Sequence, residues 1–97
     1  MHVIALRSLR LFWQKHRDAE NPLRAWHLLV TETRWENVAE IQAQFPKVSV
    51  LNDRRVVFNI GGNKYRLVAK VKYTSQKVFV RFIGTHAEYD RINANEV

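Results

Sequence analysis

The hydrophobic period of the chain changes near Pro46, and this change constrains the fold more than any other feature of the sequence. Before Pro46, apolar residues recur at intervals of three and four, which is the spacing of one face of an α-helix. After it, apolar and polar residues alternate, as in strands that bury one face. We therefore predict an α+β fold in which N-terminal helices pack on an antiparallel β-sheet. The 97 residues have room for one core, so a single domain over residues 1–97 is expected.

Three helical segments are predicted before Pro46, after a short leading strand at residues 1–4. Asn21 can cap the free N–H groups at the start of the second helix, and Pro22 follows in the first turn, where its missing N–H is harmless. Pro46 ends the third helix, because proline disfavours helical backbone in the preceding residue. The residues expected to face the core are Leu6, Leu9, Phe12, Trp13 and His16, then Leu23, Trp26, His27 and Val30, then Val38, Ile41 and Phe45.

Strands are predicted at residues 54–60, 64–73 and 78–85, with a shorter one at 48–51. The segment Gly61-Gly62-Asn63 joins the first two long strands, and its glycines can adopt the positive φ angles of a tight hairpin turn.

We predict that the last two strands pair with Tyr73 opposite Val78, which places Arg66 across from Thr85. This register gathers the apolar side chains on one face, which the helices can then cover. The apolar face consists of Tyr65, Leu67, Ala69, Val71, Val80 and Phe82. The opposite face carries the cations Arg66, Lys70, Lys72 and Arg81, with Val68, Phe79 and Ile83 between them.

Positive charge is concentrated in the second half of the chain. Residues 1–46 hold six lysines and arginines against five carboxylates, a net charge of +1, whereas residues 47–97 hold ten against four, a net of +6. A one-sided positive field favours a polyanion partner, either nucleic acid or an acidic protein segment.

The composition narrows the environment in which the protein works. The chain contains no cysteine, which excludes disulfide frameworks and Cys-ligated zinc or iron–sulfur sites. No run approaches the ~18 apolar residues of a membrane-spanning helix. We expect a cytoplasmic protein that does not associate with the membrane.

The residues after the last predicted strand combine groups that move protons with groups that bind phosphate. Thr85 and Glu88 have the spacing of a capping box, which predicts a short C-terminal helical turn. His86 and Tyr89 would lie on the same side of that turn, adjacent to Arg66. A histidine titrates near neutral pH, a tyrosine can stack on a base, and an arginine can neutralise phosphate oxygens. These are the parts needed to cleave RNA, although the same residue types are common as packing and capping groups.

The other histidines, hydroxyls and carboxylates do not form a recognisable site. His2, His16 and His27 lack metal-ligand spacing, and we interpret the last two as core histidines. No Ser/His/Asp order or paired carboxylate suggests acyl transfer or glycoside hydrolysis. The three tryptophans are interpreted as packing aromatics. No metal or cofactor site is predicted.

Two segments carry a family resemblance. Val57–Val68 contains Asn-Ile-Gly-Gly-Asn-Lys-Tyr-Arg, and Thr85–Asp90 reads Thr-His-Ala-Glu-Tyr-Asp. Together with Gln76–Arg81, Trp35–Asn37 and the start of the chain, these segments resemble the HigB toxin family of bacterial toxin–antitoxin systems. The family belongs to the wider RelE-like group, whose members cut messenger RNA, often when it is threaded through a ribosome.

The resemblance implies a RelE/ParE-like fold and a type II toxin that is an endoribonuclease, or mRNA interferase, with no required metal or cofactor. It also implies three kinds of partner: mRNA, the ribosome, and a HigA-like antitoxin with a helix-turn-helix domain. DNA would be contacted only through that antitoxin.

Site residues follow from the resemblance position by position. Arg66 matches the catalytic arginine of RelE-like enzymes, and His86 and Tyr89 lie where those enzymes place a second cation and a functional tyrosine. The lysine pair that RelE carries on the preceding strand is replaced here by Val56–Asn59. His86 would therefore transfer the proton. The predicted catalytic residues are His86, Arg66, Tyr89 and Lys70, and the predicted RNA-binding residues are Lys64, Lys72, Arg81, Arg54 and Arg55.

Two other functions are compatible with this fold class, because fold alone does not settle function. One is inhibition of DNA gyrase by a non-catalytic, ParE-like protein, and the other is RNA binding without catalysis. The antitoxin is expected to contact the basic sheet face; the alternative is that it clasps the helices near residues 9–13 or 23–30.

Overall fold

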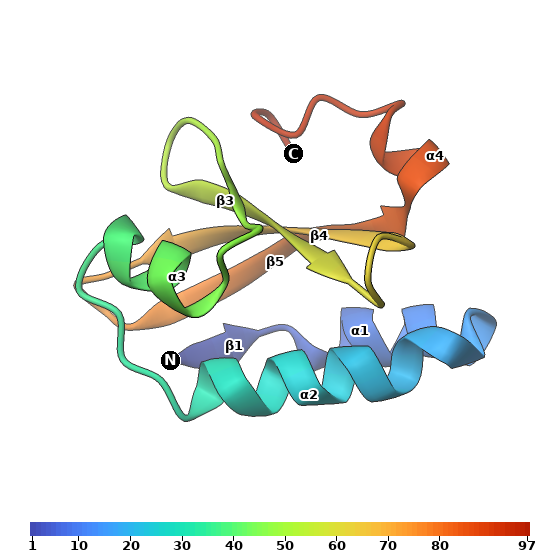
Figure 1. The fold of residues 1–97 in the computed structure, drawn as a ribbon, viewed down its shortest axis with the longest axis horizontal. Helices are drawn as coiled ribbons and strands as arrows, with labels where there is room; N and C mark the ends of the chain where they lie inside the picture. Colours follow the sequence, from blue (N-terminus) through green and yellow to red (C-terminus); the bar gives the residue numbers. More distant parts are fainter.

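Helices occupy most of the first half of the chain and strands most of the second half. This is the order that the change of hydrophobic period near Pro46 predicts. The computed structural model describes residues 1–97 (Figure 1). Its helical elements are α1 (Leu6–Lys15), the 3₁₀ turn η1 (Arg17–Ala19), α2 (Glu20–Thr31), α3 (Val38–Gln44) and α4 (His86–Tyr89). Its strands are β1 (His2–Ile4), β2 (Ser49–Val50), β3 (Arg55–Ile60), β4 (Tyr65–Lys72) and β5 (Lys77–Thr85). None of the helices has the length and apolar content needed to cross a bilayer.

The strands form one five-stranded sheet in the order β1-β5-β4-β3-β2. The pairs among β2, β3, β4 and β5 are antiparallel, as predicted. The leading strand is present as β1, but it runs parallel to β5 at the edge, so the sheet is mixed rather than wholly antiparallel. A parallel pair needs a crossover connection, and the helices and strands between β1 and β5 supply it. The α+β class is confirmed.

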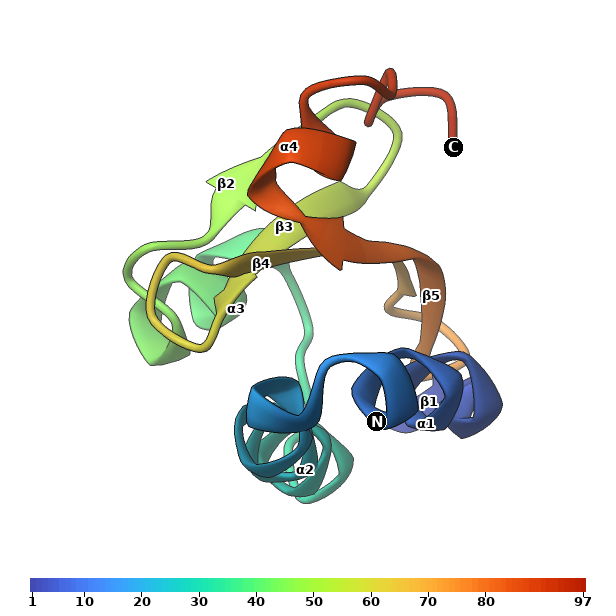
Figure 2. The same ribbon diagram turned by 90° about the vertical axis from the view of Figure 1, so that its right-hand side faces the viewer.

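The hydrophobic core lies on the face of the sheet that α1, α2 and α3 cover (Figures 1 and 2). Trp13, Trp26 and Trp35 are all buried there, which confirms their prediction as packing aromatics. The rings of Trp26 and Trp35 both contact that of Phe58, with centroids 5.3 and 6.4 Å apart. His16 and His27 are half-buried rather than fully enclosed.

The second helix begins earlier than predicted. The turn η1 runs directly into α2, which starts at Glu20, and Asn21 is therefore inside the helix and does not cap it. Pro22 still lies in the first turn, where N–H groups have no intrahelical acceptor, so it does not disturb the helix. The third helix ends before Pro46 as predicted, and its start is capped by Asn37, whose Oδ1 accepts a hydrogen bond from the Glu40 N–H at 3.2 Å.

The predicted register of the last two strands was wrong. Val71, not Tyr73, lies opposite Val78, and Tyr65 lies opposite Thr85. A β-bulge opposite Val68 and Ala69 adds one residue to β5 and shifts the pairing along the strand. As a result Phe82, predicted for the core face, packs on the opposite face, whereas Ile83 packs against the core.

The face of the sheet away from α1, α2 and α3, called the outer face below, is not open. Residues 90–97, the C-terminal segment, leave α4 and cross over it (Figure 1). Ala94 packs on Val57 and Val68 in a second apolar cluster. This cluster also contacts Leu51, Phe82, Tyr89, Ile92 and Val97. The alternation of the strands placed Val68 on this face correctly and Ile83 wrongly, and it did not predict the segment that covers the face.

Candidate functional site

Arg66 lies in a row of residues that crosses the outer face near α4. It pairs with Asn59 of β3 on one side and with Gly84 of β5 on the other. Directly opposed residues of antiparallel strands point to the same face, so Asn59 and Arg66 stand side by side. The sequence places Arg66 on this face correctly, but Gly84 takes the position predicted for Thr85.

The Arg66 guanidinium is oriented by the hairpin turn that precedes β4. Its Nη2 donates to Oδ1 of Asn63 at 2.9 Å, and its Nη1 donates to the Asn63 carbonyl oxygen at 3.4 Å. The turn reverses the chain at Gly61 and Gly62, which adopt φ angles of 64° and 70° as predicted. Both acceptors are neutral, so Arg66 is held in place while its positive charge stays uncompensated.

His86 and Tyr89 lie on α4, whose start is joined to the beginning of β4. The His86 N–H donates to the Lys64 carbonyl oxygen at 3.2 Å. The predicted capping box is present, with the Glu88 N–H bonded to Oγ1 of Thr85 at 3.2 Å and the Thr85 N–H bonded to Oε1 of Glu88 at 2.8 Å. That backbone hydrogen bond from Thr85 holds the pKa of Glu88 below its ordinary value. The His86 side chain is exposed, and its Nδ1 lies 3.5 Å from Oδ2 of Asp90.

Gly84 allows the outer face to pack closely against α4. A Cβ atom at this position would lie 2.4 Å from Cζ of Phe82 and 3.1 Å from Oε1 of Glu88. The Phe82 ring in turn contacts Tyr89, with centroids 6.5 Å apart. A larger residue at position 84 would therefore have to displace the Phe82 ring, where the strand meets the capping box.

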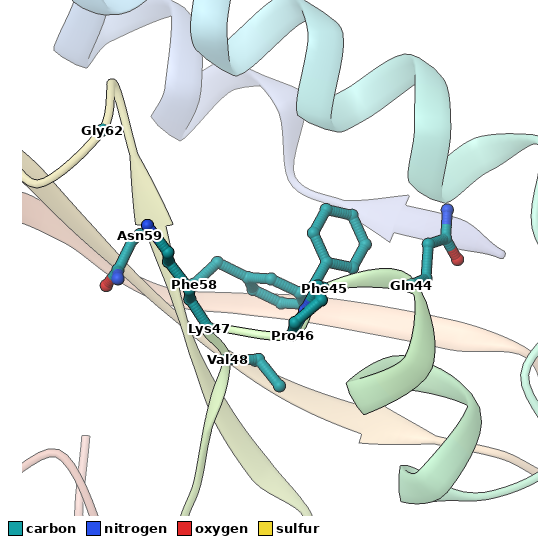
Figure 3. A pocket seen from close by; sticks show the side chains of 8 residues that line it. All are labelled: Gln44, Phe45, Pro46, Lys47, Val48, Phe58, Asn59 and Gly62. Atoms are coloured by element: carbon teal, nitrogen blue, oxygen red, sulfur yellow. The ribbon is translucent and has the colours of Figure 1, made fainter.

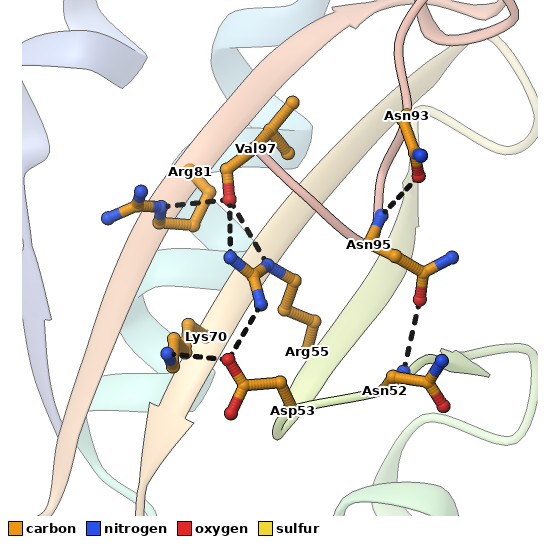
Figure 4. A network of polar contacts seen from close by, with 8 residues as sticks. All are labelled: Asn52, Asp53, Arg55, Lys70, Arg81, Asn93, Asn95 and Val97. Carbon is orange, nitrogen blue, oxygen red and sulfur yellow. Dashed lines mark hydrogen bonds and ion pairs between the residues drawn. The ribbon is translucent and has the colours of Figure 1, made fainter.

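Three of the predicted cations bind Asp53 or Val97 (Figure 4). Lys70 Nζ and Arg55 Nη1 lie 2.9 and 3.0 Å from Oδ2 of Asp53, and Lys70 lowers the pKa of this carboxyl. Arg55, only 8% exposed, also donates from Nε and Nη2 to the Val97 carbonyl oxygen at 3.1 and 2.9 Å. Nε of Arg81 donates to the same oxygen at 3.2 Å. Arg55 and Arg81 thus bind the C-terminal segment, and Asp53 brings a carboxylate to this face from the β2–β3 turn.

That turn is strained. Asp53 and Arg54 both have positive φ angles, 53° and 59°, and the Arg55 N–H closes the turn on the Asn52 carbonyl oxygen at 3.2 Å. Residues other than glycine rarely adopt this conformation. Asp53 forms two ion pairs from within this turn, and Arg54 is left exposed.

Lys64 and Tyr65 link the start of β4 to the N-terminal helices. Lys64 Nζ lies 2.7 Å from Oδ2 of Asp18, and the Tyr65 hydroxyl donates to the other carboxylate oxygen. The hydrogen bond with Lys64 lowers the pKa of Asp18, and the hydrogen bond with Asp18 raises the pKa of Tyr65 to about 12. The remaining predicted cation, Lys72, is exposed and lies 5.8 Å from the centroid of the Phe79 ring.

The Tyr65–Asp18 hydrogen bond predicts a pH-dependent contribution to stability. Because folding raises the Tyr65 pKa from 10.0 to about 12, the contribution is complete below pH 10 and is lost as the pH rises toward 12. Tyr65→Phe should therefore be less stable than the wild type at pH 8, with a gap that shrinks between pH 10 and 12. Urea midpoints measured across this range test it; a gap that stays constant would contradict the assignment.

The cavity at the edge of β3 is separate from these residues. It has a volume of about 330 Å³ and lies between β3 and the end of α3, and the side chain of Asn59 points away from Phe58 and Phe45 (Figure 3). None of the predicted site residues lines it. No group of three or more histidine, cysteine or carboxylate side chains converges in a manner suited to a metal ion.

The structure thus brings Arg66, His86 and Tyr89 to one end of the outer face, through β4 and α4, without a hydrogen bond among the three side chains. Lys70, Arg55 and Arg81 lie nearer the other end of the strands, with the C-terminal segment. Sequence reasoning missed Asn63, Gly84 and Asp53. The sequence does give a signal for Asn63, which ends the glycine turn three positions before Arg66. The contacts of Gly84 and Asp53 depend on the β-bulge and on the backbone conformation of the β2–β3 turn, and neither produces a recognisable sequence pattern.

Comparison with known proteins places the chain in a family. A family model described as HigB_toxin, RelE-like toxic component of a toxin-antitoxin system, matches residues 19–92. The mRNA interferase toxin HigB of Escherichia coli (strain K12) is 32% identical over 96 residues, which cover 97% of this chain and 92% of that protein. The mRNA interferase HigB of Shigella flexneri has the same identity and coverage. Because the match extends over most of the chain, this protein belongs to the HigB toxin family, the RelE-like toxic components of toxin–antitoxin systems.

Proposed function

We propose that this chain is the toxin of a type II toxin–antitoxin system and acts as an endoribonuclease that cleaves mRNA. Relatives aligned over nearly its whole length are named mRNA interferases. The observation that carries the proposal is Arg66, whose charge is held by neutral acceptors beside the start of α4, where His86 is exposed. Residues 1–97 act in this proposal as one toxin domain.

The proposed reaction is attack of a ribose 2′-hydroxyl on the adjacent phosphorus. The new bond closes a 2′,3′-cyclic phosphate, the bond from phosphorus to the 5′-oxygen of the next nucleotide breaks, and that oxygen leaves as a hydroxyl. Arg66 stabilises the charge that develops on the phosphorane oxygens, because its two-nitrogen fork matches them. His86 transfers the proton, and Tyr89 orients the RNA or stacks on a base. Lys70 adds positive charge, but less than an unpaired lysine would, because Asp53 already neutralises it.

The predicted RNA-binding cations differ in how freely they can meet a phosphate. Arg54 and Lys72 are exposed and form no ion pair, so we assign them the first contacts with the RNA backbone. Lys64, Arg55 and Arg81 must exchange Asp18, Asp53 or the Val97 carbonyl oxygen for phosphate.

The proposal includes the partners and the conditions of the reaction. The toxin acts on mRNA in the cytoplasm, in association with the ribosome, and is neutralised by a HigA-like helix-turn-helix antitoxin that alone contacts DNA. Cleavage by a histidine and an arginine requires no metal.

Mapping new 5′ ends of mRNA after brief expression tests the proposal. New ends should appear within minutes in the wild type, before growth stops. A gyrase supercoiling assay on the same preparation separates the alternatives: gyrase inhibition without new ends would support the ParE-like function, and RNA binding with neither would support a binding module.

Asn63 gives a graded test of the Arg66 role. Asn63→Ala removes the 2.9 Å acceptor of the guanidinium and should lower kcat by roughly tenfold, because a loosely held group is seldom in the reactive geometry. Asn63→Asp keeps an acceptor at this position but adds a carboxylate that compensates the Arg66 charge, so its loss in kcat should be at least as large as that of Asn63→Ala. Steady-state cleavage of a model RNA measures kcat for both variants, and wild-type kcat in Asn63→Ala would argue against an orienting role.

A further inference from the structure

A groove lies between α1 and α2. Both helices lie on the side of the sheet away from the outer face (Figure 2). The groove encloses about 310 Å³. The residues that line this α1–α2 groove are Leu6, Arg10 and Trp13 from α1 and Arg24, His27 and Leu28 from α2. None of the predicted site residues is among them.

The α1–α2 groove combines an apolar floor with a positive rim. Leu28 is 58% exposed and lines the groove together with the buried Trp13, so the groove leaves an apolar side chain free for a partner to cover. Arg24 lies 4.8 Å from the centroid of the Trp13 ring and pairs with Glu20, whereas Arg10 forms no ion pair. No carboxylate lines the groove, and burial together with the charge of Arg10 lowers the pKa of His27.

The outer face has less free apolar surface and fewer unpaired cations for a partner to bind than the sequence predicted. The C-terminal segment already covers its apolar centre, and Arg55, Lys70 and Arg81 already have acceptors. A partner that docked there would have to displace both. The α1–α2 groove needs no such exchange, because its leucine is exposed and Arg10 is unpaired.

We propose that the α1–α2 groove holds an acidic amphipathic segment of the antitoxin, with its apolar side on Leu28 and Trp13 and its carboxylates on Arg10. The inference rests on the proposed function, because it takes the toxin–antitoxin partner as the occupant. The net charge of +7 would speed association with such a segment at low salt. This location differs from the basic face expected from the sequence, and it leaves Arg66 and His86 uncovered, so neutralisation works by the bulk of the bound antitoxin.

Two pairs of exposed neighbours provide matched variants. Leu28→Glu places a carboxylate in the groove, whereas Leu29→Glu makes the same change at a residue that is 48% exposed, lies next in the same helix and does not line the groove. Arg10→Glu reverses a charge on the rim, and Arg7→Glu reverses one on the same helix outside it. The probe is the purified cognate antitoxin, titrated against each full-length variant.

Leu28→Glu and Arg10→Glu should each weaken antitoxin binding by roughly tenfold or more, while their controls bind as the wild type does. Co-expressed antitoxin should then fail to rescue growth from these two variants. Wild-type affinity in Leu28→Glu, or equal losses in Leu28→Glu and Leu29→Glu, would overturn the inference. Because binding is measured without RNA, absence of mRNA cleavage in the wild type would reject the proposed function without changing this result.

Discussion

Arg66→Ala is expected to abolish growth arrest and to lower RNA cleavage by about 10²–10³-fold, while the protein stays folded. Arg66 is half-buried and lies outside the core clusters, so its loss leaves no cavity there, and its guanidinium hydrogen-bonds only to Asn63. Its removal therefore deletes charge stabilisation rather than packing. His86→Ala should cause a loss of about 10²–10⁴-fold, because it removes the proton-transfer group.

Arg34→Ala is the matched control, since Arg34 is exposed and pairs only with Glu36, two residues away. Cleavage rates are compared by following 5′ ends of a defined mRNA, and folding by circular dichroism. Full growth arrest by soluble, folded His86→Ala would remove this histidine from the mechanism, and the same outcome for Arg66→Ala would remove the arginine.

Gly84→Ala is expected to lower the free energy of unfolding by about 1–3 kcal/mol and to reduce toxicity as well. The added methyl would lie 2.4 Å from Cζ of Phe82, so the ring must move away from Tyr89. It would also press on Oε1 of Glu88, which caps α4 through Thr85. A core change alone would affect stability, whereas this one also displaces the helix that carries His86.

Phe82→Leu provides the second variant for this prediction. Leucine is smaller at the position that meets the new methyl, so Gly84→Ala combined with Phe82→Leu should be more stable than the sum of the two single changes predicts. Urea unfolding of the four proteins measures the coupling. Additive losses in the free energy of unfolding would mean that the methyl added by Gly84→Ala does not act through its contact with Phe82.

The parts of the fold that the sequence predicted are those governed by local rules. Helical spacing identified Leu9, Trp13 and Ile41 as core residues, and the Gly61–Gly62 turn and the Thr85 capping box depend on neighbours a few positions apart. Each has a physical cause that acts within one element.

The parts it did not predict depend on residues that are distant in the chain. The bulge in β5 moves Phe82 and Ile83 between faces, although the alternation of the sequence continues through it. The contact of Arg55 with the Val97 carbonyl oxygen joins positions 42 residues apart, and nothing in the composition of the C-terminal segment indicates it. For the candidate site, residue types and resemblance identified Arg66 and His86, but the orientation of Arg66 by Asn63 required coordinates.

The parallel pairing of β1 with β5 means that the sheet can be completed only after β5 has been synthesised. His2 lies opposite Lys77 and Ile4 opposite Phe79, so the first strand to be synthesised hydrogen-bonds to the last. A nascent chain therefore leaves the ribosome with an incomplete sheet, and contacts between such distant segments form slowly. We expect the chain to be inactive while it is being translated, and this delay gives an antitoxin that is already folded an interval in which to meet each new toxin molecule before it can act.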